Sequence, residues 1–355
     1  MPSPAKQELS VAASDSGQRL DRYLTSQLPE LSRTRIQELI EAGLVLVDAK
    51  PAKGSYKLRG GEKIMVDAQA RPPMRAEPEA IPLTILYEDH DVIVVNKPAG
   101  MTVHAGAGNT RGTLVNALLG RGQSLSAGGD ALRPGIVHRL DKETSGVILV
   151  AKNDFAHAKL AEQFQQRTVK KTYIALVEGL LKDRQGRMDL PIGRDLYRRT
   201  RMAAYERKPG TSLRGHLLGG NAREARTDWR ALAQVDGTTF VEVQLHTGRT
   251  HQIRVHFSAI KHPVVGDVLY GAAPQLCPEP KSPRGKSWER DRSLLPPLGR
   301  NFLHAAWLGF SQPRTGDWME VRAPLPPELR AFLHSLVSAA NEDSKRIDAV
   351  LAPYL

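Results

Sequence analysis

Residues 239–260 read TFVEVQLHTGRTHQIRVHFSAI, a stretch that places a strand, a turn and a helix in immediate succession. Over residues 239–245 the aliphatic side chains fall on every second position, which is the period of a β-strand. Over residues 250–260 apolar residues recur every three or four positions, which is the period of a helix. Gly248 stands between the two and permits a tight turn. The stretch therefore predicts a strand that turns directly into a helix.

The same two patterns recur on the N-terminal side of this stretch. Strand patterns outnumber helix patterns there and do not alternate with them strictly. This order favours an α+β fold with a mixed, largely antiparallel central sheet over a regular doubly wound fold. The other predicted strands are 83–87, 92–96, 147–152 and 172–177, and the other predicted helices are 113–119 and 154–166. Residues 194–224, rich in glycine and arginine, are predicted to form an exposed loop or hairpin, and residues 278–300 a polar loop.

A separate small module is predicted before residue 68. Apolar residues at helical spacing indicate one helix near residues 20–28, and Ser32 can cap a second one that ends at Gly43. Short strands are predicted at 44–47 and 63–66. The module is strongly cationic, and the basic residues that we expect to contact RNA are Arg33, Arg35 and Lys53.

The chain divides into five parts on this reading. We predict a flexible N-terminus at 1–16, the cationic module at 17–67, a proline-containing linker at 68–80, the main domain at 81–340 and a C-terminal tail at 341–355.

The charge balance points to a polyanionic partner. Fifty Lys and Arg against 38 Asp and Glu leave a net charge of +12 over 355 residues. The basic residues are spread over several segments, which favours nucleic acid over a membrane surface. We expect no membrane association and infer no obligate protein partner.

The sequence lacks the features of membrane proteins and of secreted, disulfide-bonded proteins. No run approaches the ~18 uninterrupted apolar residues of a membrane span. Cys277 is the only cysteine, which excludes disulfides and cysteine-rich zinc sites, and the first 17 residues lack the apolar core of a signal peptide. We therefore expect a cytoplasmic protein.

Residues 135–146, GIVHRLDKETSG, gather charged side chains just before a predicted buried strand. Such residues belong to a loop, and loops held by a sheet commonly carry catalytic groups. Asp141 lies among cations, which keep a carboxylate ionised and able to act as a nucleophile or base. A solvated charged turn would give the same pattern, so these residues alone leave both interpretations open.

Two further segments carry polar side chains near predicted strands. In TGRTHQIRVH, residues 247–256, Arg249 and a helix N-terminus could bind an anionic group, and Arg254 could reach a neighbouring carboxylate. The histidines of this region lack the spacing of a zinc helix, so no metal site is expected. In KKTYIA, residues 170–175, Tyr173 is either half-buried core or a stacking platform for a base.

These segments together resemble a known family of RNA-modifying enzymes. HRLDKETSG and TGRTHQIRVH, with LYEDHDVIVVNKPAGMTVHAG before them and KHPVVGDVLYG after, are similar to the pseudouridine synthases of the RluA/RluD family. Residues 19–66 resemble the S4 RNA-binding domain, which the larger members of that family carry. The loops near 207–225 and 278–300 look longer than the family usually has.

The resemblance implies a function and roles for individual residues. It implies an RNA pseudouridine synthase with an α+β catalytic domain that needs no cofactor or metal. By the same resemblance Asp141 is the catalytic aspartate, Tyr173 stacks on the target base, Arg254 is the basic partner of the aspartate, and Arg139 helps to displace the target nucleotide.

The resemblance implies RNA as the substrate, and among RNAs the 23S RNA of the large ribosomal subunit or its precursor particle. Three alternatives remain open at this point. The same chemistry could act on transfer RNA or another ribosomal site, the protein could be a noncatalytic ribosome-assembly factor, or it could be a hydrolytic glycosylase that releases uracil.

Overall fold

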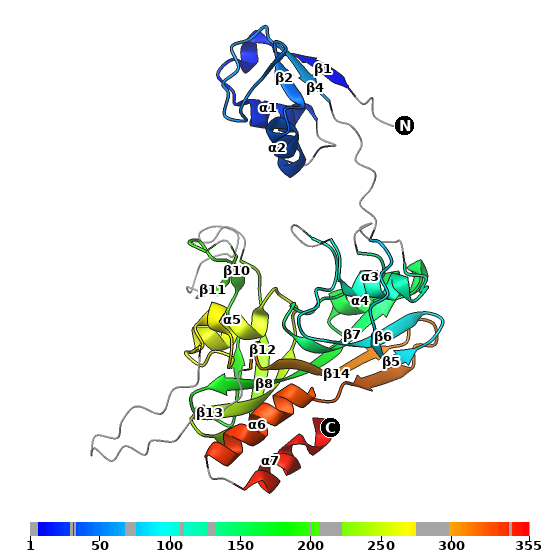
Figure 1. The fold of residues 1–355 in the computed structure, drawn as a ribbon, viewed down its shortest axis with the longest axis vertical. Helices are drawn as coiled ribbons and strands as arrows, with labels where there is room; N and C mark the ends of the chain where they lie inside the picture. The colour runs from blue at the N-terminus through cyan, green and yellow to red at the C-terminus, as the bar shows by residue number, and fades with distance from the viewer. Residues whose placement is uncertain are drawn as a thin grey trace, which may run out of the picture. The chain divides into compact units, whose positions relative to one another are not determined.

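The computed structural model describes residues 6–28, 31, 33–67, 76–106, 110–126, 133–198, 200–205, 222–274, 298–340 and 343–354. The chain divides into two compact units, Met1–Met74 and Arg75–Leu355 (Figure 1). The predicted linker at 68–80 and the predicted loop at 278–300 fall largely outside the described residues.

The first unit is a small sheet with two helices. Its elements are β1 Gln7–Ser10, α1 Leu20–Gln27, α2 Arg33–Glu41, β2 Val45–Val47, β3 Lys50–Pro51 and β4 Lys63–Val66. The strands pair in the order β1-β4-β2-β3, all antiparallel. Leu20, Leu24, Leu39 and Ile64 are almost fully buried in its core. The two predicted helices and two predicted strands are present, and β3 was not predicted. The prediction of a flexible N-terminus at 1–16 is wrong for its described part, because β1 pairs with β4 there.

The second unit is built on a nine-stranded sheet. Its strands are β5 Thr84–Glu88, β6 Val92–Lys97, β7 Ser145–Ala151, β8 Lys170–Glu178, β9 Gln185–Met188, β12 Thr227–Val235, β13 Thr238–Leu245, β14 Leu303–Ser311 and β15 Trp318–Arg322. They follow the order β5-β6-β7-β14-β8-β13-β12-β9, and β15 pairs with β14. Only β7 and β14 run parallel among these neighbours. The prediction of a mixed, largely antiparallel sheet is confirmed.

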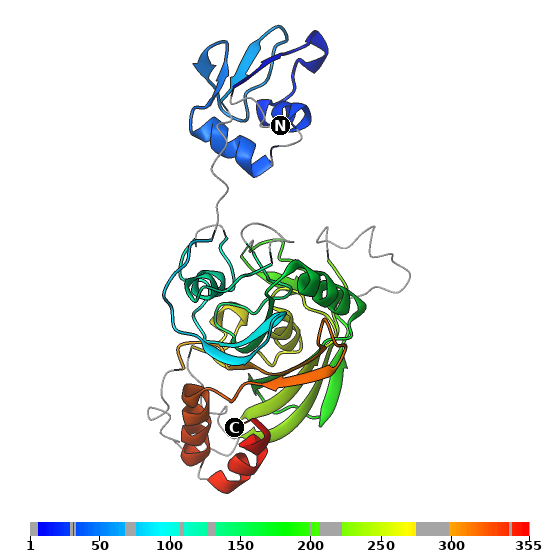
Figure 2. The same ribbon diagram turned by 90° about the vertical axis from the view of Figure 1, so that its right-hand side faces the viewer.

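Five helices pack on this sheet, namely α3 Leu114–Gly120, α4 Asp154–Gln166, α5 Gln252–Ala259, α6 Pro327–Ala339 and α7 Ser344–Leu351. On one face Phe257 of α5 packs on Trp229 of β12, with the ring centroids 6.3 Å apart. On the other face Phe332 of α6 packs on Phe302 at 6.2 Å. Figures 1 and 2 show α6 and α7 side by side along that second face.

Several elements of the second unit were missed from the sequence. Strand β12 was missed because a bulge between Ala231 and Ala233 interrupts its alternation. Strand β14 was missed because it is buried along most of its length, and a continuous apolar run has no distinctive period. The predicted tail at 341–355 is also corrected, since α7 lies there and Leu351 is fully buried in the main core.

The predicted loop or hairpin at 194–224 contains a hairpin in its described part. Strands β10 Ile192–Arg194 and β11 Met202–Ala204 pair antiparallel, while residues 199 and 206–221 lie outside the described part. Among the described residues, no helix is both long enough and apolar enough to cross a membrane.

Candidate active site

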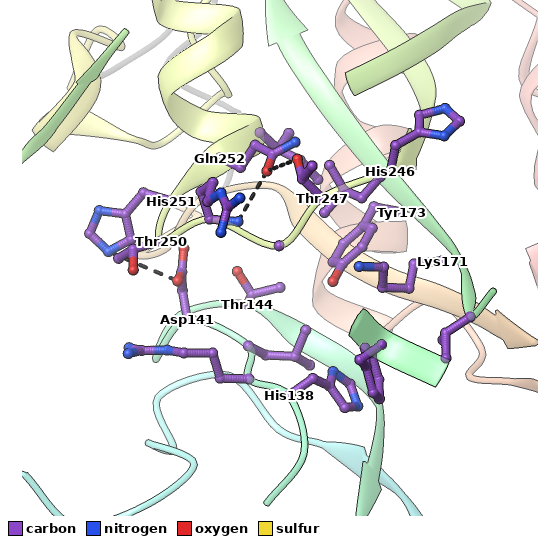
Figure 3. Close-up of a pocket in the computed structure, with 18 of the residues that line it drawn as sticks. His138, Asp141, Thr144, Lys171, Tyr173, His246, Thr247, Thr250, His251 and Gln252 are labelled. Atoms are coloured by element: carbon purple, nitrogen blue, oxygen red, sulfur yellow. Dashed lines mark hydrogen bonds and ion pairs between the residues drawn. The ribbon is translucent and has the colours of Figure 1, made fainter. Parts of the chain in front are cut away.

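A cleft of about 380 Å³ opens in the second unit (Figure 3). Its walls come from five places in the chain: the loop before β7, the C-terminal end of α4, the start of β8, the turn from β13 into α5, and the first residue of β14. All three segments that the sequence analysis singled out contribute residues to it. The fold therefore brings together side chains that are more than 100 positions apart in the chain.

Asp141 projects into this cleft from the loop that precedes β7 (Figure 3). Its side chain is 14% exposed, and its Oδ2 accepts a hydrogen bond from Nη1 of Arg254 at 3.3 Å. The main-chain N–H of Thr144 bonds back to the carbonyl of Asp141 and closes the turn. Asp141 is thus a shielded carboxylate paired with a cation, and it does not lie in a solvated turn.

Arg254 is fixed from the opposite side by a second carboxylate. Its Nε and Nη2 donate to the two oxygens of Asp267, at 2.5 and 2.9 Å, and its guanidinium lies 4.9 Å from the centre of the Tyr270 ring. Burial alone would lower the pKa of Arg254, but the bond to Asp267 and the charges of Asp267 and Asp141 raise it. Arg254 therefore stays cationic and presents its remaining Nη1 to Asp141.

The turn from β13 into α5 differs from its prediction in one detail. The residue with left-handed backbone is His251, at φ 57°, and Gly248 has no positive φ. The turn is closed from within by Gln252, whose side-chain oxygen accepts bonds from the Thr247 hydroxyl and the Arg249 main chain. A non-glycine residue in this conformation costs of order 1–3 kcal/mol, and such positions cluster at functional sites.

Tyr173 lies on the wall of the cleft formed by β8. It pairs across the sheet with Val243, which in turn pairs with Trp229, so the three side chains share the face that carries α5. The side chain is only 7% exposed, and burial together with the charge of Asp141 raises the pKa of its phenol. The phenol is therefore neutral at ordinary pH. Its ring is buried as the core interpretation had it, yet it also lines the cleft.

Two titratable residues of the cleft were missed from the sequence. Burial lowers the pKa of Lys171 to about 8, and its ammonium lies 5.8 Å from the centre of the Phe164 ring. Burial and then the charge of Lys171 lower the pKa of His138 to about 3. His138 stacks on Phe164 at 4.8 Å, and its Nε2 accepts the main-chain N–H of Leu149. The sequence did carry a hint of both residues. His138 lies in the charged motif GIVHRLDKETSG, and Lys171 lies in KKTYIA beside Tyr173.

A buried lysine supports the loop that carries Asp141. Lys97 is fully buried, and its ammonium donates to the carbonyls of Pro98, Met101 and Lys142, the last of which directly follows Asp141. Burial, with the charge of Arg300 adding to it, lowers the pKa of Lys97 to about 7. Lys97 therefore ties the segment after β6 to the segment before β7.

The remaining predicted residues lie in different places. Arg139 is exposed and lines the cleft beside Asp141. Arg249 also lines it, but its Nε donates to the carbonyl of Glu224 at 2.9 Å. In the first unit Lys53 is exposed, whereas the side chains of Arg33 and Arg35 and the predicted cap Ser32 lie outside the described residues.

No cluster of three or more His, Cys, Asp or Glu side chains placed to hold a metal is found within the described part of the chain. The histidines of the region from His251 to His262 are instead bonded to protein groups. His256 contacts the Thr227 hydroxyl and the Leu190 carbonyl, and His262 contacts the Glu178 carbonyl.

Comparison with known proteins places both units in described families. The family model for RNA pseudouridylate synthase matches residues 91–259, and the model for the S4 domain matches residues 18–64. An uncharacterized RNA pseudouridine synthase of Aquifex aeolicus is 43% identical over 83% of this chain and 86% of its own length. A ribosomal large subunit pseudouridine synthase D of Nitrosomonas europaea is 43% identical over 86% of this chain and 80% of its own.

A solved structure is similar as well. The human RNA pseudouridylate synthase domain containing 4 superposes with a TM-score of 0.51 at 27% identity and covers 71% of this chain and 92% of the human chain.

Proposed function

Because this chain belongs to the RNA pseudouridylate synthase family, we propose that the cleft around Asp141 is where it isomerises uridine in RNA to pseudouridine, with Asp141 as the catalytic carboxylate. The observation that carries the proposal is the ion pair between Asp141 and Arg254 inside that cleft. It places the one reactive group that the reaction requires, a carboxylate, beside a cation in the cleft.

The reaction rearranges atoms without adding any. The N1–C1′ glycosidic bond of uridine breaks, the uracil turns, and C5 bonds to C1′, while the C5 proton leaves and N1 takes up a proton. A carboxylate can trap the sugar carbon, as in retaining glycosidases, or take a proton from the ribose. Either role needs a carboxylate that is shielded from water, and Asp141, 14% exposed and paired with Arg254, meets that condition.

The target nucleotide has to leave its helix to reach Asp141, because C1′ is inaccessible in a stacked duplex. Unstacking costs a few kcal/mol, and less in loops. The cleft offers cations on either side of Asp141 for the phosphates, Arg139 at its rim and Lys171 in its wall. We propose that these side chains hold the flipped nucleotide by its backbone.

We propose that Tyr173 contacts the uracil in two ways: its ring stacks on the base, and its neutral hydroxyl relays the C5 proton by accepting it while passing its own hydrogen on. Tyr173→Phe keeps the ring and should bind RNA as the parent does, while turnover falls by about 10²-fold, the lower range for loss of a general acid or base. Tyr173→Leu should also lose affinity, by the ~1–3 kcal/mol of a stacked base. Single-turnover rates and filter binding separate the two effects. Full turnover of Tyr173→Phe would restrict the residue to stacking.

Lys171 makes the interaction with RNA depend on pH. Burial lowers its pKa to about 8, so the side chain loses its charge as the pH rises through 8, and RNA affinity should fall with it. Replacement by Met should flatten that dependence and reduce the salt slope of binding by about one. Lys170→Met, at the exposed neighbouring position, is the matched control and should keep the pH dependence. Equal pH profiles for the parent and Lys171→Met would contradict the assignment.

We propose RNA of the large ribosomal subunit as the substrate, because three relatives at 41–43% identity are named ribosomal large subunit pseudouridine synthase D. Incubation with transcribed ribosomal and transfer RNA, followed by carbodiimide-blocked primer extension, tests this. New stops on large-subunit RNA alone support it, and stops on transfer RNA would identify transfer RNA as the substrate.

The bacterial relatives favour the cytoplasm as the location, although two plant relatives are named chloroplastic.

The first unit is proposed to select the substrate. It has its own hydrophobic core and matches the S4 domain, so the second unit should fold without it. Removing residues 1–67 should weaken discrimination between large-subunit RNA and unrelated RNA, while slow conversion of small RNAs persists. Competition binding between large-subunit RNA and unrelated RNA measures this discrimination. Unchanged discrimination would count against an RNA-binding role for this unit.

A further inference from the structure

Tyr270 connects the active site to the β10–β11 hairpin. Its hydroxyl accepts the main-chain N–H of Met202 in β11 at 3.0 Å and contacts Nδ1 of His251 at 2.7 Å. Its ring lies between two guanidinium groups, with Arg201 at 5.1 Å and Arg254 at 4.9 Å from its centre. The side chain is 2% exposed, so its position is fixed by these contacts.

These contacts determine which nitrogen of His251 carries the proton. The Tyr270 hydroxyl already accepts from Met202, and its own hydrogen needs an acceptor because the group is buried. Nδ1 of His251 is the acceptor at hand, at 2.7 Å. Burial also lowers the pKa of His251, so the ring is neutral and its single hydrogen is on Nε2.

That Nε2–H group points toward Asp141 but does not bond to it. The distance from Nε2 to Oδ1 of Asp141 is 3.9 Å, too long for a hydrogen bond, while Oδ2 of the same carboxylate is held by Arg254 (Figure 3). The donor therefore lies beside the reactive carboxylate with room for an oxygen of the substrate. Its left-handed backbone, at φ 57°, aims the ring into the cleft at a cost in strain.

We propose that His251 donates a hydrogen bond from Nε2 to the 2′-hydroxyl of the target ribose, and that Tyr270 is the positioning residue that fixes this donor. The assignment rests on the proposed role of Asp141. If that carboxylate reaches C1′ the 2′-oxygen is two bonds away, and if it reaches C2′ one bond, so a donor adjacent to the carboxylate can reach that oxygen. The 2′-hydroxyl is also the group that distinguishes RNA from DNA. His251 would thus make the enzyme specific for ribose.

A cycle of protein and substrate variants tests the contact. The substrates are a short RNA containing the mapped target uridine and the same RNA with 2′-deoxyuridine at that one position. The deoxy substrate should lower kcat/KM of the parent by about tenfold more than it lowers kcat/KM of His251→Asn, because only the parent has the donor to lose. Tenfold is about the size of one lost hydrogen bond with an unpaired partner. Other effects of the 2′-hydroxyl act in both arms and cancel.

The choice of variants separates the contact from folding. Asn tolerates left-handed backbone and places its amide at the position of Nδ1, so it cannot reach the substrate. His251→Gln places its amide at the position of Nε2 and should restore most of the tenfold discrimination. Tyr270→Phe keeps the ring between the two arginines but frees the tautomer of His251, and should lower the discrimination to an intermediate value.

Equal penalties for the deoxy substrate in the parent and in His251→Asn would overturn the proposal, even if Asp141 is catalytic. If Tyr270→Phe distinguishes the RNA substrate from the deoxy substrate as strongly as the parent does, the positioning role of Tyr270 would be overturned. Failure of the broader proposal has a different signature, since an active Asp141→Asn variant would remove the carboxylate on which the placement of the ribose depends.

Discussion

Asp141→Asn is expected to bind RNA within about threefold of the parent and to lose turnover by at least about 10⁴-fold. The amide has nearly the shape of the carboxylate and adds no charge, so RNA contacts elsewhere in the cleft should persist. It cannot serve as nucleophile or base, because an amide lacks the negative charge of a carboxylate. Single-turnover pseudouridine formation, with the binding constant measured in parallel, gives both numbers.

The matched control is Asp317→Asn, which makes the same chemical change at an exposed position between β14 and β15. It should leave both turnover and affinity unchanged. Turnover of Asp141→Asn at more than about one hundredth of the parent rate would remove Asp141 from the reaction and leave only an RNA-binding protein.

Arg254→Met is expected to lower the free energy of unfolding by about 3–5 kcal/mol, the range for removing one partner of a buried ion pair. It would leave Asp267, which is 3% exposed, without its two charged hydrogen bonds. It would also remove the cation that faces Asp141, so the activity of the folded fraction should fall as well. Denaturant unfolding measures the first effect and active-site titration of the remaining folded protein the second.

Two companion variants isolate the cause. Arg230→Met breaks a pair with Glu242 in which the arginine side chain is 60% exposed, and it should cost less than about 1 kcal/mol. Adding Asp267→Asn to Arg254→Met removes the unpaired buried charge and should restore part of the stability, but none of the activity. Full loss of stability in the double variant would contradict the ion-pair explanation.

The sequence predicted those elements whose pattern is local. The strand at 239–245 and the helix after it appear as β13 Thr238–Leu245 and α5 Gln252–Ala259 because one face of each is apolar and the other is not. Elements buried on both sides, such as β14, have no such contrast, and α7 lies in the stretch that was wrongly predicted to be a tail. The order of the strands in the sheet could not be predicted from the sequence either. The parallel pairing of β7 with β14 joins segments about 160 positions apart.

The candidate site could be predicted in its residue types but not in its geometry. The motifs pointed to Asp141 and Arg254, and the structure brings them to 3.3 Å. The resemblance included the motif with Asp267 and Tyr270, but only the fold shows that these two hold Arg254 in place. The low pKa of Lys171 was unpredictable for a similar reason, since burial depends on what packs around a side chain.

The proposed reaction is an isomerisation that takes place in the cleft of Asp141 and releases no free uracil. Nucleoside analysis of large-subunit RNA after complete digestion tests this directly, with the parent protein and with Asp141→Asn. With the parent protein, we expect the amount of pseudouridine formed in the RNA to equal the amount of uridine lost, with no free uracil. With Asp141→Asn, we expect the amounts of both nucleosides to stay unchanged. Free uracil in the parent reaction, or pseudouridine formed by Asp141→Asn, would contradict it.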